Sequence, residues 1–74
     1  MSKAVAQNLI GPSIRKLRYQ RGMTQAMLTA RCNRAGWDMG ENTIAKIEAR
    51  IRCVTDREIV YLAKALGVKV QDFF

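Results

Sequence analysis

Apolar residues recur every three or four positions in several short segments of this chain, and no segment of useful length alternates apolar and polar residues. A spacing of three to four places side chains on one face of an α-helix, whereas a period of two indicates a β-strand. The sequence therefore predicts an all-α fold, a compact bundle of four or five short helices. A chain of 74 residues suffices for one domain with a small core.

The start of the first helix is signalled by proline. Pro12, directly after Gly11, suits the first position of a helix, because the missing N–H would have no intrahelical partner there. Gly22 is the expected stop. Residues 1–9 are interpreted as an N-terminal arm or a short helix, and residues 10–74 as the folded domain.

Two later helices carry start and stop signals. Thr24 is expected to cap the second helix. Thr55 and Glu58 have the spacing of a capping box, in which each side chain satisfies a backbone N–H at the start of a helix. Gly36 and Gly67 follow these two helices where a left-handed residue is favoured.

A short third helix is expected over residues 41–49. Ile44, Ile47 and Ile51 recur at helical spacing and are expected to face the core. The opposite face carries small and polar side chains: Asn42, Ala45, Lys46 and Ala49. Such a face allows the helix to lie against a partner without clashing.

Positive charge is concentrated in the first half of the chain. The formal net charge is +7, and residues 1–37 contain seven Lys and Arg and no acidic residue. This excess attracts phosphate polymers, although anionic membranes and acidic proteins would feel the same field. A solvated surface without function is the alternative interpretation.

Several classes of protein are disfavoured by what the sequence lacks. The chain has no His, and Cys32 and Cys53 form no CxxC motif, so neither a zinc site nor a redox dithiol is expected. Convergent carboxylates and a Gly-rich phosphate loop are also missing, and we expect no enzymatic activity and no cofactor. The lack of a long apolar stretch or a secretory signal predicts a cytoplasmic protein without a membrane anchor.

Three stretches of the sequence, in this order, resemble the phage-repressor and Cro-type helix-turn-helix family, also called the xenobiotic-response-element (XRE) family. They are RYQRGMTQ at residues 18–25, NTIAKIE at 42–48 and LAKALGV at 62–68. The resemblance covers about residues 10–74. It implies a small repressor-like transcription regulator that binds double-stranded DNA as a homodimer. A protein-interaction module on the same fold, antitoxin-like or adaptor, is the alternative.

The resemblance also implies site residues, with the second helix for positioning and the helix at 41–49 as the recognition helix in the major groove. Gln25 and Thr43 match phosphate-contacting positions, and Glu41, Asn42 and Lys46 match positions that face base edges. Arg50 and Arg52 follow the recognition helix, where this fold commonly reaches the sugar-phosphate backbone. Glu41 has an alternative role as a cap of its own helix.

An internal ion pair between Arg18 and Glu48 is also implied by the resemblance. The sequence departs from the phage members around residues 34–38, where extra residues lengthen either the second helix or the turn. The set of base contacts therefore stays open. We expect Trp37, in this segment, to cover the core rather than to stack on a base.

The chain ends in two aromatic residues. Phe73 and Phe74 are expected either to fold back over the fourth helix or to form a dimer surface.

Overall fold

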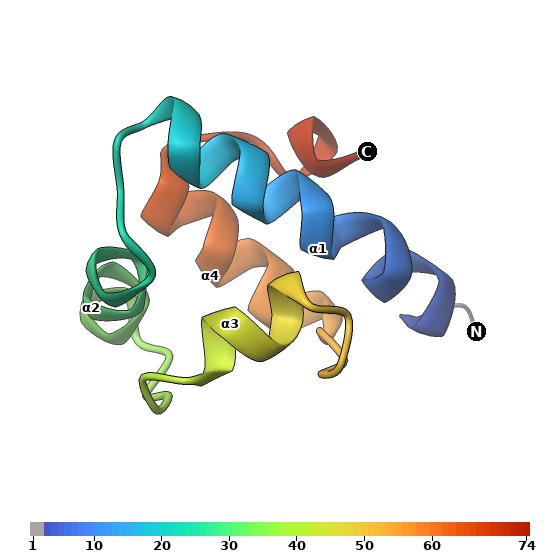
Figure 1. Cartoon of the computed structure of the whole chain (residues 1–74), viewed down its shortest axis with the longest axis horizontal. Coiled ribbons are helices and arrows are strands. Elements are labelled where there is room, and N and C mark those ends of the chain that lie inside the picture. The colour runs from blue at the N-terminus through green and yellow to red at the C-terminus, as the bar shows by residue number, and fades with distance from the viewer. Residues whose placement is uncertain (1–2) are drawn as a thin grey trace.

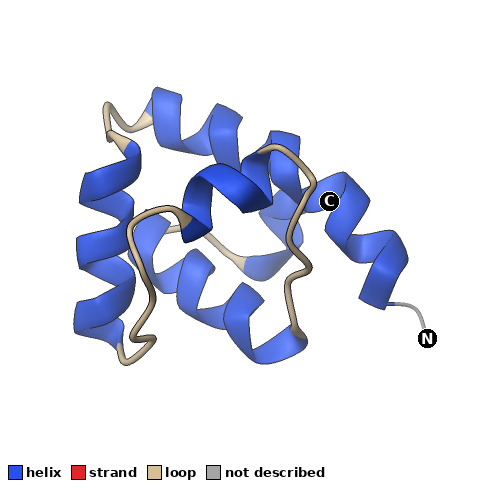
Figure 2. Ribbon diagram, turned by 60° about the horizontal axis from the view of Figure 1, so that its bottom comes forward, coloured by secondary structure: helices blue, strands red, loops and turns tan. Residues whose placement is uncertain are grey.

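The computed structural model describes residues 3–74, with side chains described from Ile10 onward. The elements are α1 (Lys3–Gln20), α2 (Gln25–Ala35), α3 (Thr43–Glu48), α4 (Asp56–Leu66) and the 3₁₀ helix η1 (Val70–Phe73). Figure 1 shows α4 beside α1, with α2 at one end and α3 along one side. No strand occurs within residues 3–74 (Figure 2), so the predicted all-α class is confirmed.

One hydrophobic core joins all of these elements. Its fully buried members come from every helix, which is how a domain of this size satisfies several amphipathic faces at once. They include Ile10, Ile14, Leu28, Cys32, Ile44, Ile47, Leu62, Leu66 and Phe73. None of the helices in the described range is both long and apolar enough to cross a bilayer.

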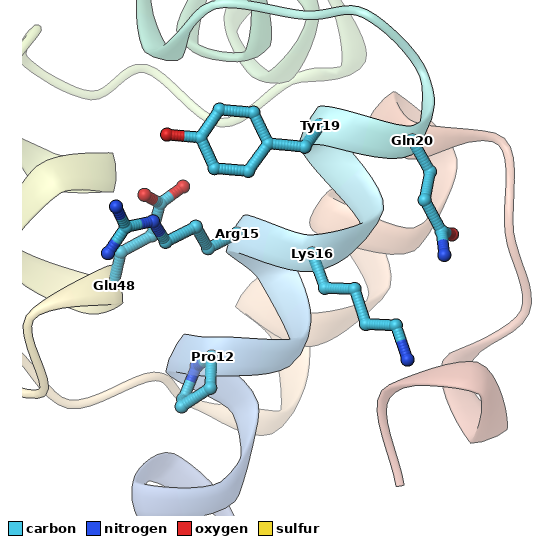
Figure 3. Close-up of a pocket in the computed structure, with 6 residues that line it drawn as sticks. All are labelled: Pro12, Arg15, Lys16, Tyr19, Gln20 and Glu48. Carbon is cyan, nitrogen blue, oxygen red and sulfur yellow. The ribbon is translucent and has the colours of Figure 1, made fainter.

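The first helix begins earlier than the sequence suggested. We predicted a start at Pro12, but α1 begins at Lys3 and Pro12 lies inside it, on its exposed side (Figure 3). A proline inside a helix removes one backbone hydrogen bond. Ile10, one turn of helix closer to the N-terminus than Ile14, is fully buried, and its packing holds this part of α1 in place. Residues 1 and 2 of the predicted arm lie outside the described range.

Gly11 lies inside α1 because two backbones approach closely there. A Cβ atom on Gly11 would lie 2.6 Å from the carbonyl oxygen of Ile47, a distance that real Cβ atoms do not show. The glycine therefore allows α1 to pack directly against the backbone of α3. Its role is helix packing, and the predicted helix start at this position is wrong.

The predicted caps of α2 and α4 are confirmed. The hydroxyl of Thr24 accepts a hydrogen bond from the backbone N–H of Met27 at 3.1 Å. Thr55 and Glu58 form the expected reciprocal capping box. Gly36 and Gly67 follow these helices with φ of 119° and 72°, the left-handed region that glycine adopts without steric cost.

The end of α3 differs from the prediction. The helix stops at Glu48, and Arg50 adopts a left-handed conformation with φ of 64°. The N–H of Ile51 then bonds to the carbonyl oxygen of Lys46, which closes the helix as in a Schellman motif. Ile51 is consequently turned away from the core and is 75% exposed, so its predicted core position is wrong.

The C-terminal segment folds back onto the domain. Phe73 is buried against the core, and its carbonyl oxygen accepts a hydrogen bond from Ser13 of α1 at 2.9 Å. Phe74 is 64% exposed. The two aromatic residues therefore differ: Phe73 is part of the core, and Phe74 is a surface residue.

Candidate nucleic-acid interface

The outward face of α3 and the turn before it carry the residues that the resemblance assigned to base recognition. Glu41, Asn42 and Lys46 are exposed, and Thr43 is half-buried. Ile44 and Ile47 anchor the opposite face in the core. The helix is shorter than the predicted 41–49, because Asn42 is its capping position and Glu48 its last residue.

The alternative role of Glu41 as a helix cap is not seen, and Asn42 at the capping position of α3 does not cap it either. The Asn42 side chain makes no capping hydrogen bond. Among the side chains described, that of Glu41 has no hydrogen bond or ion pair either. Both polar groups therefore point to solvent, where they are available to a ligand.

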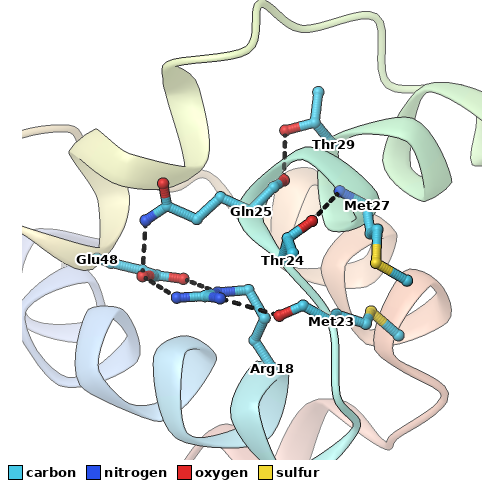
Figure 4. Close-up of polar contacts among 7 residues, drawn as sticks. All are labelled: Arg18, Met23, Thr24, Gln25, Met27, Thr29 and Glu48. Atoms are coloured by element: carbon cyan, nitrogen blue, oxygen red, sulfur yellow. Dashed lines mark hydrogen bonds and ion pairs between the residues drawn. The ribbon is translucent and has the colours of Figure 1, made fainter.

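Three helices are tied together by the carboxylate of Glu48 at the end of α3. The Arg18 guanidinium of α1 donates to both of its oxygens, at 2.8 and 3.0 Å. Gln25, the first residue of α2, donates its amide N–H to the same carboxylate at 3.1 Å (Figure 4). The remaining guanidinium nitrogen of Arg18, Nη1, donates a hydrogen bond to the backbone carbonyl oxygen of Met23 at 2.9 Å. The predicted ion pair is confirmed, and it fixes α3 against α1 and α2.

This network is almost fully buried, and the positive charge of Arg18 is matched by the negative charge of Glu48. The hydrogen bond to Glu48 raises the pKa of Arg18 against the opposing effect of burial. Every buried side-chain nitrogen and oxygen within the described residues has a hydrogen-bond partner. Gln25, assigned from sequence to a phosphate, thus has its amide nitrogen engaged inside the protein. The sequence pattern did not reveal this contact, because it depends on how α2 meets α3.

The two arginines after α3 lie in different environments. Arg50 is exposed. Arg52 is only partly exposed, and its terminal nitrogens bind the two carboxylate oxygens of Glu58 at 3.0 and 3.1 Å. Partial burial opposes ionisation of Glu58, but the bonds from Arg52 and Thr55 outweigh it and lower its pKa. Arg52 therefore braces the connection between α3 and α4.

Trp37 completes this brace. Its ring stacks with Tyr61 of α4 at a centroid distance of 6.3 Å, and the Arg52 guanidinium lies 5.6 Å from the Trp37 ring centroid. Trp37 is partly buried and packs against the core, as predicted. Trp37 thereby anchors the long connection that leads into α3. A hydrogen bond from the backbone N–H of Met39 to the side-chain oxygen of Asn33, at 3.0 Å, also holds this connection in place.

Basic side chains occur on two sides of the domain. Arg31 and Arg34 of α2 line a shallow hollow together with Lys64 of α4, and no residue of α3 belongs to it. Arg15 and Tyr19 of α1 instead line a hollow that reaches Ala45 of α3 and Ala49, directly after this helix. No role at the site was expected for Arg15 or Tyr19 from the sequence. Helical spacing could have placed them on one face of α1, but not beside α3.

The comparisons with known proteins agree with this arrangement. A family model described as helix-turn-helix matches residues 14–73, which is most of the chain. A search of curated proteins and a search of solved structures each found no significant match.

Proposed function

Since the chain belongs to the Cro/C1-type helix-turn-helix family of DNA-binding regulatory domains, we propose that it recognises a specific duplex sequence as a small repressor-like transcription regulator in the cytoplasm. The observation that carries this proposal is the outward face of α3. Asn42 and Lys46 are exposed there on a helix that Arg18, Gln25 and Glu48 hold in a fixed orientation.

The residues of α3 suit the edges of bases in the major groove. An Asn side chain can pair with adenine through two hydrogen bonds, and Lys can donate to guanine. Glu41 can accept from the amino group of cytosine. The small side chains of Ala45 and Ala49 let the helix approach the bases closely.

Phosphate contacts are proposed beside this face. Arg50 is the stronger of the two candidates after α3, because Glu58 already occupies both terminal nitrogens of Arg52. Thr43, half-buried at the start of α3, supplies a hydroxyl donor. Gln25 gives one amide N–H to Glu48, so a phosphate contact from Gln25 would use its second amide N–H or its backbone N–H.

The proposal is tested by selecting bound duplexes from a random DNA pool at fixed salt. Asn42→Ala and Lys46→Ala should change which bases are preferred, each at a cost of about 1–3 kcal/mol on the preferred duplex. Lys64→Ala, on the other side of the domain, serves as the control and should leave the preference unchanged. If neither α3 variant changes the selected sequence, α3 is not the recognition helix.

A second candidate function is a protein-interaction module on the same fold. The observation that favours it is the 75% exposure of Ile51 beside the α3 face. A stoichiometric protein partner that is lost in Ile51→Asn, together with weak DNA binding without sequence preference, would support this function over the first.

We also propose that the protein acts as a homodimer on paired half-sites, whose centres lie about 34 Å apart along DNA. The exposed ring of Phe74 supports this assignment as an apolar surface that a second copy of the chain would cover. Light scattering should show a dimer at high micromolar concentration, and only monomer at that concentration would contradict it.

A further inference from the structure

Arg15 and Tyr19 lie on the side of α1 that faces α3. Figure 3 shows both side chains directed toward α3, whereas Lys16 and Gln20 point toward the C-terminal segment. A hollow of about 220 Å³ connects Arg15 and Tyr19 to Ala45 and Ala49. The outward face of α3 is therefore continuous with this part of α1.

The floor of the hollow carries no free negative charge. Glu48 lines it, but Arg18 and Gln25 donate three hydrogen bonds to the Glu48 carboxylate. Arg15 forms no ion pair with any side chain described in the structure. Its positive charge is consequently available to an anion from outside.

Tyr19 adds a second donor next to Arg15. Tyr19 is 60% exposed and its ring lies near two cations, with the guanidinium carbons of Arg15 and Arg18 at 5.6 and 4.6 Å from the ring centroid. The neighbouring guanidinium groups of Arg15 and Arg18 lower the pKa of Tyr19, because they favour its ionised form.

The position of the hollow matches where a DNA strand would pass. The major groove is about 12 Å wide, and a helix with its side chains measures about 10–12 Å across. A helix in the groove therefore has a phosphate backbone along each flank. Ala45 and Ala49 are too small to keep that backbone away from the α1 side of α3.

We propose that Arg15 and Tyr19 together bind a backbone phosphate of the DNA strand that borders α3 on its α1 side. This inference rests on the proposed DNA-binding function and extends the interface to the first helix. The guanidinium supplies charge and two parallel donors, and the phenol hydroxyl supplies a third. The contact adds affinity and fixes register, and it reads no base.

Salt titration of DNA binding tests the pair directly. The duplex selected by the wild-type protein and an unrelated duplex are each titrated with Arg15→Gln, Tyr19→Phe and Lys16→Gln. Lys16→Gln is the matched control, because it removes one charge from the adjacent position on the other side of α1. Urea unfolding of each variant shows that the domain remains folded, as expected for exposed side chains.

Arg15→Gln should weaken binding to both duplexes about tenfold at physiological salt. It should also reduce the slope of log K against log salt by about 0.9, the value for one phosphate contact. Tyr19→Phe should weaken binding roughly threefold, as for one neutral hydrogen bond, without a change in slope. Lys16→Gln should change affinity less than twofold. Ethylation of one phosphate should weaken the wild type and leave Arg15→Gln unaffected.

Two other outcomes separate this inference from the proposed function. If Arg15→Gln and Lys16→Gln lose the same DNA-binding affinity, and Arg15→Gln responds to phosphate ethylation like the wild type, the phosphate site is wrong. The proposed function would still stand as long as the Asn42 and Lys46 variants change the base preference. A wild-type protein that binds neither duplex would overturn both.

Discussion

Arg18 and Glu48 are thirty residues apart in the chain, yet they form a bidentate ion pair in which 6% and 5% of the two side chains are exposed. Removing one partner leaves an uncompensated buried charge, which typically costs about 3–5 kcal/mol. A domain of this size is stable by only about 4–11 kcal/mol. The pair that orients α3 therefore also makes the fold sensitive to the loss of either partner alone.

We therefore expect Glu48→Gln, which keeps the shape and removes the charge, to lower the free energy of unfolding by about 3 kcal/mol or more. Urea unfolding followed by circular dichroism measures the loss. The double variant Arg18→Met with Glu48→Met should recover much of it, because two apolar groups leave no buried charge. A single variant with wild-type stability would mean that the pair is dispensable.

Gly11→Ala should destabilise the domain by about 1–3 kcal/mol, the range for overpacking. An alanine in an ordinary helix position would stabilise it instead, but here its Cβ meets the Ile47 carbonyl oxygen at 2.6 Å. Gly40→Ala is the control, because a Cβ at Gly40 has no neighbour within 4 Å. A Gly11→Ala protein with a raised melting temperature would show that α1 and α3 can separate at no cost.

Arg50→Gly should raise the free energy of unfolding by about 1 kcal/mol. The left-handed conformation of residue 50 costs a non-glycine residue about 1–2 kcal/mol, and glycine adopts it without this cost. The same variant should bind DNA more weakly, with a salt slope reduced by about 1. Arg50→Ala separates the two effects, because it loses the charge and keeps the backbone strain. If both variants bind DNA like the wild type, Arg50 makes no phosphate contact.

The two cysteines should differ sharply in reactivity. Burial raises the pKa of Cys32 to about 11, whereas Cys53 is exposed. Only Cys53 should react with a thiol reagent near pH 8 while the domain is folded, and both should react in denaturant. Because the folded-state pKa of Cys32 is raised, its contribution to stability is complete below pH 9 and is lost as the pH approaches 11. Cys32→Ala should remove that part of the alkaline destabilisation.

Glu58 should give the opposite dependence on pH. Its pKa is lowered in the folded state, so its contribution is present above the ordinary carboxylate range and is lost as the pH falls through the lowered value. Trp37 fluorescence reports the change locally, because Arg52 lies between the Trp37 ring and Glu58. Glu58→Gln should flatten the acid limb of the stability curve, and an unchanged limb would show that the Arg52 pair contributes nothing.

Local signals predicted much of this fold. The caps at Thr24 and Thr55 depend on residues within one turn of helix, so the sequence contains all the information needed. The start of α1 was missed because burial of Ile10, a tertiary effect, outweighs the local penalty of Pro12. Ile51 was misplaced because Arg50 ends α3 in a conformation that usually requires glycine.

The candidate site was harder to predict from sequence. The outward direction of Asn42 and Lys46 followed from the spacing of Ile44 and Ile47. The ion pair between Arg52 and Glu58 could not be predicted in this way, because it depends on the course of the chain between α3 and α4. Residues that act through neighbouring elements, rather than along one helix, are invisible to periodicity.

The shortness of α3 has a consequence for dynamics. Six residues cannot persist as an isolated helix in water, so α3 exists only while α1, α2 and the core hold it. Its hydrogen-bonded amide protons, such as that of Lys46, should exchange with solvent when the packing of the domain around α3 opens. DNA recognition by α3 therefore requires the folded domain. Heat or proteolysis that releases α1 will abolish DNA binding in the same transition.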